Sequence, residues 1–121
     1  MTAPTGPRDL AELRNALREF AAQRDWDQFH SPKNLASALS VEAAELLECF
    51  QWLTEEQSRK LTPEQHAEVR EEIADVLNYL VRLADKLDVD LLDAAREKIG
   101  KNAIKYPVEK ARGSMKKYSK L

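Results

Sequence analysis

Hydrophobic residues recur at intervals of three and four along most of this 121-residue chain, which is the spacing of one face of an α-helix. The pattern predicts four main helices, over about residues 7–24, 32–53, 62–87 and 90–105. Ser31, Thr62 and Asp90 stand at the expected N-cap positions of the last three helices. Pro107 prevents the fourth helix from continuing, so residues 106–121 are predicted to form an extended C-terminal arm.

No segment shows the sustained alternation of β-branched residues that a strand requires. We therefore expect an all-α fold, an antiparallel bundle of the four main helices that forms a single domain over residues 1–121. The fourth helix is short and polar, so a second subunit is expected to complete the core. The chain is accordingly predicted to be a homo-oligomer, either a dimer or a tetramer.

One position of the apolar stripe on the second helix is occupied by an acid, Glu42. Glu42 forms an i, i+3 pair with Glu45, and the third helix carries a second such pair, Glu72 and Asp75. A carboxylate within an apolar stripe must be paired, protonated or bound to a cation. If the two helices pack antiparallel, the two acidic pairs can face each other and bind a cation.

The available ligand types limit which cation this could be. Oxygen ligands without cysteine partners favour a hard divalent ion such as Mg²⁺, for which Mn²⁺ could substitute. Di-iron bundles need a histidine three residues after a glutamate, and neither His30 nor His66 has that spacing. Zinc would require histidine or cysteine ligands. The alternative is that Glu45, Glu72 and Asp75 are ordinary surface acids.

Charge is divided unevenly along the chain. Residues 1–95 carry ten basic and nineteen acidic side chains, a net charge of -9, whereas residues 96–121 carry nine basic and two acidic, a net charge of +7. Lys98, Asn102 and Lys105 share one helical face and could bind an anionic ligand, or the lysines could simply be solvated. Nucleic-acid binding is not expected from so short a basic tract in a mildly acidic chain.

The remaining composition bears on the compartment. A single cysteine, Cys49, cannot form an internal disulfide and suggests a reducing compartment, which we expect to be the cytoplasm. No apolar run approaches the ~20 residues that span a bilayer, so no membrane association is expected.

Several sequence segments, taken together with the acidic pairs, strongly resemble the MazG-like all-α nucleoside triphosphate pyrophosphohydrolases. The resemblance is greatest to the dCTP pyrophosphatase subgroup of that family, and it covers about residues 8 to 118. The segments are RDWDQFHSPKNL (24–35), FQW (50–52), EEIADVLNYL (71–80), KYPV (105–108) and RGS (112–114).

The resemblance implies a magnesium-dependent hydrolase that cleaves a nucleoside triphosphate between its α and β phosphates, giving the monophosphate and pyrophosphate. The implied substrate is dCTP or a modified cytosine deoxynucleotide, removed to clean the nucleotide pool. By analogy Glu42, Glu45, Glu72 and Asp75 are the metal ligands. Glu45 is further expected to orient or deprotonate the attacking water.

The resemblance also implies a set of substrate-binding residues. They comprise base and sugar contacts together with phosphate contacts: Trp26, His30, Trp52, Tyr79, Lys98, Asn102, Lys105, Tyr106 and Arg112. Arg112 could reach a neighbouring subunit's site. The sequence departs from the animal members at Leu17, where they carry a histidine near the base pocket.

A second class of function is compatible with the same pattern. A non-catalytic helical module could bind a nucleotide or a protein partner through the acidic groove without turning it over. The presence of all four candidate ligands favours catalysis.

Overall fold

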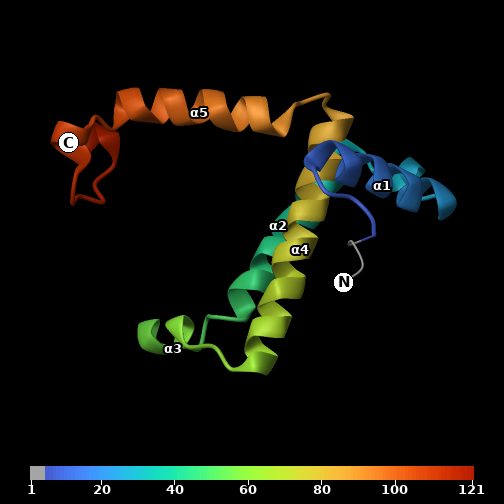
Figure 1. Cartoon of the computed structure of the whole chain (residues 1–121), viewed down its shortest axis with the longest axis horizontal. Helices are drawn as coiled ribbons and strands as arrows, with labels where there is room; N and C mark the ends of the chain where they lie inside the picture. Colours follow the sequence, from blue (N-terminus) through green and yellow to red (C-terminus); the bar gives the residue numbers. More distant parts are fainter. Residues whose placement is uncertain (1–4) are drawn as a thin grey trace. The chain divides into compact units, whose positions relative to one another are not determined.

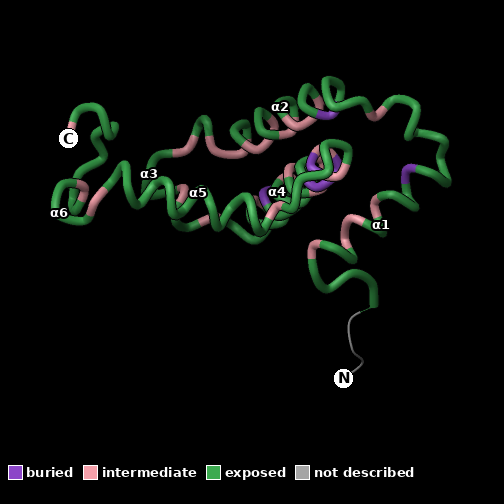
Figure 2. The backbone as a smooth tube through the Cα atoms, turned by 90° about the horizontal axis from the view of Figure 1, so that it is seen from above, coloured by how far each residue is buried: buried purple, intermediate pink, exposed green. Residues whose placement is uncertain are grey.

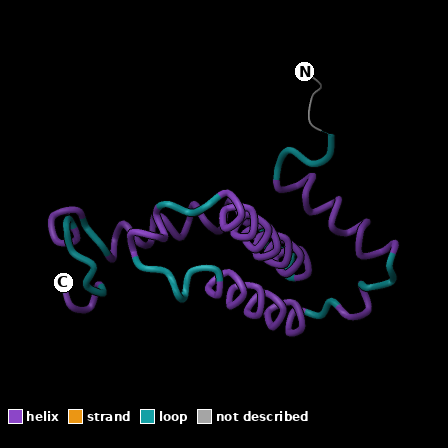
Figure 3. Tube along the Cα trace, turned by 90° about the horizontal axis from the view of Figure 1, so that it is seen from below, coloured by secondary structure: helices purple, strands orange, loops and turns teal. Residues whose placement is uncertain are grey.

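The computed structural model describes residues 5–121, and within them it contains helices and no strand (Figure 3), which confirms the all-α prediction. The α-helices are α1 (Leu10–Gln23), α2 (Pro32–Glu48), α3 (Glu55–Arg59), α4 (Pro63–Lys86), α5 (Leu91–Lys105) and α6 (Val108–Ala111). Two short 3-10 helices accompany them, η1 (Asp27–Phe29) and η2 (Tyr118–Lys120). The chain divides into two compact units, of which the first ends at Asp88 and the second spans Val89–Leu121.

The centre of the first unit is the pair α2 and α4, which run side by side in opposite directions (Figure 1). Buried residues concentrate where helices of this unit meet (Figure 2). Leu35 of α2 is 1% exposed, and Val69 and Val81 of α4 are 7% and 3% exposed. Helix α1 also packs on α4, where Ala21 is buried.

Side chains cap the main helices as the sequence predicts. The Ser31 hydroxyl accepts a hydrogen bond from the Asn34 backbone N–H, and Thr62 forms a reciprocal capping box with Gln65. Asp90 caps α5 in the same way, by accepting from the Asp93 N–H. These local hydrogen bonds satisfy donors that a helix leaves free at its start.

Four stretches differ from the sequence prediction. Helix α1 begins at Leu10 rather than near residue 7, because the Asp9 carboxylate caps it by accepting from the Glu12 N–H. Helix α2 ends at Glu48, because residues 49–53 form turns whose backbone bonds include Leu53 N–H to the Phe50 carbonyl. Residues 54–61, which lie between the second and third predicted helices, contain the additional helix α3, which Thr54 caps. The stretch predicted as an extended arm contains α6 and η2, and Pro107, which prevents α5 from continuing, is the N-cap residue of α6.

None of the helices within residues 5–121 combines the length and the apolar character that crossing a bilayer requires. Cys49 is a free, half-buried cysteine. Its Sγ lies within hydrogen-bonding distance of the Glu45 carbonyl, one turn earlier on α2.

The packing of α2 can be tested at two leucines of that helix. Leu35→Ala is expected to lower the free energy of unfolding by about 2–5 kcal/mol, because it leaves a cavity in the core. Leu47 is 62% exposed, so Leu47→Ala should change stability by no more than about 0.5 kcal/mol. Urea unfolding followed by circular dichroism measures both. Equal losses in the two variants would contradict the core described above.

Candidate metal and nucleotide site

Packing of α2 against α4 brings three of the four predicted metal ligands together. Glu42 and Glu45 come from α2 and Glu72 from α4, and each offers a carboxylate oxygen within 4.8 Å of the others. All three side chains are half-buried. The i, i+3 spacing of Glu42 and Glu45 places both on the face of α2 that meets α4. We call these three residues the acidic cluster.

The acidic cluster contains buried oxygens that the protein leaves without partners. Within the described residues, neither Glu42 Oε2 nor Glu72 Oε2 has a hydrogen-bond partner. Burial, a hydrogen bond with Glu45 and repulsion by the neighbouring carboxylates raise the pKa of Glu42 to about 7. Burial and the Glu45 charge likewise raise the pKa of Glu72.

An all-carboxylate donor set of this kind fits a hard divalent cation. Such ions take oxygen ligands, and their charge offsets the mutual repulsion of the carboxylates. The cluster adjoins an open hollow of about 400 Å³ that is lined by Glu45, Glu48, Cys49, Glu68 and Glu72. A ligand held by the cation could therefore extend into this space.

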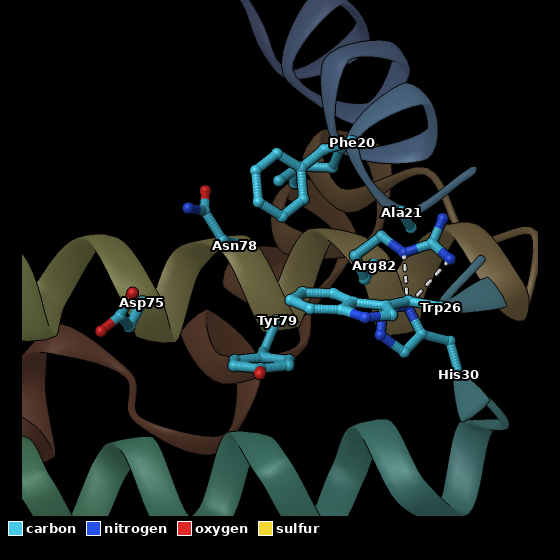
Figure 4. A pocket seen from close by; sticks show the side chains of 9 residues that line it. Phe20, Ala21, Trp26, His30, Asp75, Asn78, Tyr79 and Arg82 are labelled. Carbon is cyan, nitrogen blue, oxygen red and sulfur yellow. Dashed lines mark hydrogen bonds between the residues drawn. The ribbon is translucent and has the colours of Figure 1, made fainter. Parts of the chain in front are cut away.

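Asp75, the fourth predicted ligand, is placed somewhat apart. It is exposed, and the three-residue cluster does not include it, although its charge contributes to the raised pKa of both Glu42 and Glu72. Asp75 also lines a second cavity (Figure 4). It therefore connects the acidic cluster with that cavity.

The second cavity has a volume of about 280 Å³ and lies between α1, the η1 segment and α4 (Figure 4). Its walls are formed by Leu17, Phe20, Ala21, Trp26, His30, Asp75, Asn78, Tyr79 and Arg82. The rings of Phe20 and Trp26 meet edge to face with their centroids 5.8 Å apart. The volume is near the lower end for small-molecule sites, so it suits part of a nucleotide, such as the base.

A tight corner after α1 brings Trp26 and His30 to this cavity. Asp25 adopts a left-handed conformation with φ of 54°, which turns the chain back after α1. The Gln28 amide donates to the backbone carbonyl and to the carboxylate of Asp25, each at 3.0 Å. Aspartate tolerates this backbone region better than most residues, and here the corner is closed by its own hydrogen bonds.

The structure adds one residue that the sequence interpretation missed, Arg82 of α4. It is 5% exposed, and among residues 5–121 it is the one charged residue that is buried. Its guanidinium donates to Asp27 Oδ1 at 3.0 Å and approaches His30 Nδ1 at 3.2 Å from Nε. A signal was present, because Arg82 continues the 3–4 spacing of Glu72, Asp75 and Tyr79.

The remaining predicted substrate contacts are Trp52 and five residues of the second unit. Trp52 is 87% exposed in the turn that follows α2, and it does not line the cavity. Five further residues lie in the second unit: Lys98, Asn102, Lys105, Tyr106 and Arg112. There Tyr106 packs edge to face on Tyr118, and the Lys105 ammonium lies 4.9 Å from the Tyr118 ring centre. Their roles toward a nucleotide stay predictions.

The fold and the site together define a class of protein, an all-α bundle with a cluster of carboxylates beside an aromatic cavity. The sequence matches the MazG-like family over residues 37–121. With the relatives described next, this match shows that the chain belongs to the MazG-like family.

The chain is 46% identical to dCTP pyrophosphatase 1 of Mus musculus over 114 residues, which is 93% of this chain and 67% of the mouse protein. It is 43% identical to dCTP pyrophosphatase 1 of Bos taurus over 128 residues, covering 99% of this chain and 76% of the bovine protein. A crystal structure of a pyrophosphatase from Archaeoglobus fulgidus DSM 4304 matches with a TM-score of 0.78 and 41% identity. That match covers 88% of this chain and 99% of the archaeal one. These similarities support nucleotide pyrophosphohydrolase activity.

The unpartnered carboxylates predict how stability depends on pH. The pKa of Glu42 is raised in the folded state, so the stability that neutral Glu42 confers is present below its unfolded pKa and is lost as pH rises through about 7. In EDTA at pH 8, Glu42→Gln should therefore have a higher unfolding temperature than the unsubstituted protein. The difference should disappear near pH 4.

Thermal unfolding followed by circular dichroism at both pH values measures the effect. Glu19→Gln removes an exposed carboxylate of α1 and serves as the control. A Glu42→Gln variant that is less stable than the unsubstituted protein in EDTA at pH 8 would contradict the account of the acidic cluster.

Proposed function

We propose that this protein hydrolyses dCTP, or related modified cytosine deoxynucleotides, to the monophosphate and pyrophosphate. The observation that carries the proposal is the acidic cluster, with three carboxylate oxygens within 4.8 Å of one another and two buried oxygens without partners. Identity of about 45% to proteins named dCTP pyrophosphatase 1 supports the choice of substrate.

Glu42, Glu45 and Glu72 would hold Mg²⁺, with Mn²⁺ as a possible substitute, and Asp75 would complete the ligand set from the cavity side. When bound, the cation supplies charge neutralisation for the triphosphate and acidifies the attacking water. The protein supplies the arrangement, because α2 and α4 fix the carboxylates before the substrate arrives.

Glu45 is the residue we assign to the water. It belongs to the acidic cluster and also lines the adjoining hollow, so its carboxylate can face both the cation and a phosphate. In this role it orients the water and accepts its proton. The water oxygen then bonds to the α-phosphorus, the bond between that phosphorus and the bridging oxygen breaks, and pyrophosphate leaves.

The aromatic cavity would receive the base, with Phe20 and Trp26 as its apolar wall and Tyr79 close to the sugar. Leu17 lines this cavity in the position where animal relatives are expected to carry histidine. An apolar residue there leaves the polar recognition of the base to other cavity residues. Trp52 would contact the base only if a partner subunit or a rearrangement brought it near.

The basic residues of the second unit, with Lys98, Lys105 and Arg112 among them, would bind the phosphates.

The protein would act in the cytoplasm, which its single cysteine, Cys49, favours. It would act there as a homo-oligomer, because α4 leaves Ile73 and Leu77 53% and 39% exposed. Light scattering should then give a mass above the 13.8 kDa of one chain. A 13.8 kDa particle would contradict the oligomer.

Catalysis can be tested at Glu45. With Mg²⁺, the purified protein should release pyrophosphate from dCTP, and Glu45→Gln should lower kcat by at least about 100-fold, since the water loses its base. An ion-exchange assay of dCMP, pyrophosphate and orthophosphate identifies the bond that is cleaved.

The exposed carboxylate Glu56 gives a matched control, because Glu56→Gln removes an equal charge from α3. Equal rates in Glu45→Gln and Glu56→Gln would overturn the assignment of Glu45. Nucleotide binding without any turnover would instead support the non-catalytic module.

A further inference from the structure

Besides its ion pairs, the buried Arg82 contacts the imidazole of a second cavity residue, His30. Its guanidinium approaches His30 Nδ1 twice, at 3.2 Å from Nε and at 3.1 Å from an Nη nitrogen, and both residues line the cavity. Figure 4 shows Arg82 directed at the imidazole ring, next to Trp26.

These contacts fix which nitrogen of His30 carries the proton. An arginine side chain can only donate hydrogen bonds, so the ring nitrogen that faces it must act as an acceptor. With Nδ1 unprotonated, a neutral imidazole carries its proton on Nε2. Burial and the positive charge of Arg82 also lower the pKa of His30, which favours the neutral ring.

Surrounding carboxylates stabilise Arg82 without help from the imidazole. Asp27 accepts from Arg82 at 3.0 Å, and its other partner is Lys86 at 2.6 Å. Asp85 lies 3.7 Å from Arg82 and is held mainly by Arg18 of α1. The buried charge is therefore balanced, and a protonated His30 would add a second positive charge beside it.

We propose that Arg82 is a positioning residue for base recognition, because it makes His30 Nε2–H a fixed hydrogen-bond donor of the aromatic cavity. No hydrogen bond within residues 5–121 engages Nε2, so this donor is available to a ligand. The inference rests on the proposed function and deepens it, since it names what the cavity recognises.

A fixed donor selects bases by the edge they present. Cytosine carries two neighbouring acceptors, the O2 carbonyl and the unprotonated N3, whereas uracil and thymine carry a proton on N3. A donor placed against N3 thus favours cytosine and leaves an N–H facing an N–H with the other pyrimidines. The cavity should accordingly bind cytosine nucleotides in preference to uracil and thymine nucleotides.

The tautomer can be measured first, in the protein without nucleotide. Nitrogen-15 NMR of the imidazoles should show His30 as the neutral Nε2–H form, with exposed His66 of α4 as the internal reference. Arg82→Gln should bring His30 close to the tautomer mixture of His66. Arg18→Gln breaks the contact with Asp85 but leaves the Arg82–His30 contact, so it should leave the His30 signals unchanged.

Kinetics on dCTP and dUTP then test whether the tautomer matters. His30→Ala should raise KM for dCTP about tenfold with kcat changed less than about twofold, since one hydrogen bond to the base is lost. Arg82→Gln should raise KM by a smaller factor, because the tautomer mixture leaves part of the His30 population with its proton on Nε2. The preference for dCTP over dUTP should fall in both variants. In a His30→Ala background, Arg82→Gln should raise KM no further, because Arg82 acts through His30.

Two results would overturn the proposal. One is a proton on Nδ1 of His30 in the unsubstituted protein, a measurement that does not depend on any variant folding. The other is an effect of Arg82→Gln that is equally large with and without His30, which would show a merely structural role. Absence of nucleotide cleavage by the unsubstituted protein would count against the proposed function and would leave the tautomer measurement standing.

Discussion

Packing of α2 against α4 places carboxylates of like charge beside one another, and the other features of the site follow from that contact. Apolar residues such as Leu35 and Val69 make the helix pair stable, and the pair then holds Glu42 and Glu72 where water cannot fully solvate them. The carboxylates of the acidic cluster repel one another, and a bound cation would offset that repulsion. The apolar packing that stabilises the helix pair therefore also creates the repulsion that a bound cation would relieve.

The same helix α4 carries the remaining polar groups of the site at successive turns. Glu72 meets α2, Asp75 lies between the cluster and the cavity, and Tyr79 and Arg82 line the cavity wall. A single helix of 24 residues thus sets the order of the acidic cluster, the linking carboxylate and the aromatic cavity along one axis. Loops could not hold this order with comparable precision.

Features that depend on local sequence were predictable. Caps at Ser31, Thr62 and Asp90 are made by neighbouring backbone groups, so the main helices begin where the sequence indicates. The acidic cluster was also predictable, because i, i+3 pairs on two packed helices leave few alternative placements. Asp75 shows the limit of that reasoning. It follows Glu72 by one turn of α4, yet the acidic cluster includes Glu72 and not Asp75.

Features that depend on tertiary contacts were not predictable. The burial of Arg82 arises from contacts with Asp27 and His30, which lie more than 50 positions away in the chain. The exposure of Trp52 follows from the end of α2 at Glu48, where turns replace the expected last helical residues. Helix α3 had a capping signal at Thr54, but a five-residue helix offers too little periodicity for the pattern to reveal it.

The cavity has two walls that belong to different parts of the chain. Phe20, Ala21 and Trp26 come from α1 and the corner closed by Asp25, and the opposite wall comes from α4. The walls are joined by ion pairs whose outer members, Arg18 and Asp27, are 52% and 60% exposed. Dissolved salt screens exposed pairs far more than buried ones. The attachment of α1 to α4 should therefore depend on ionic strength more than the apolar core contacts of α2 with α4 do.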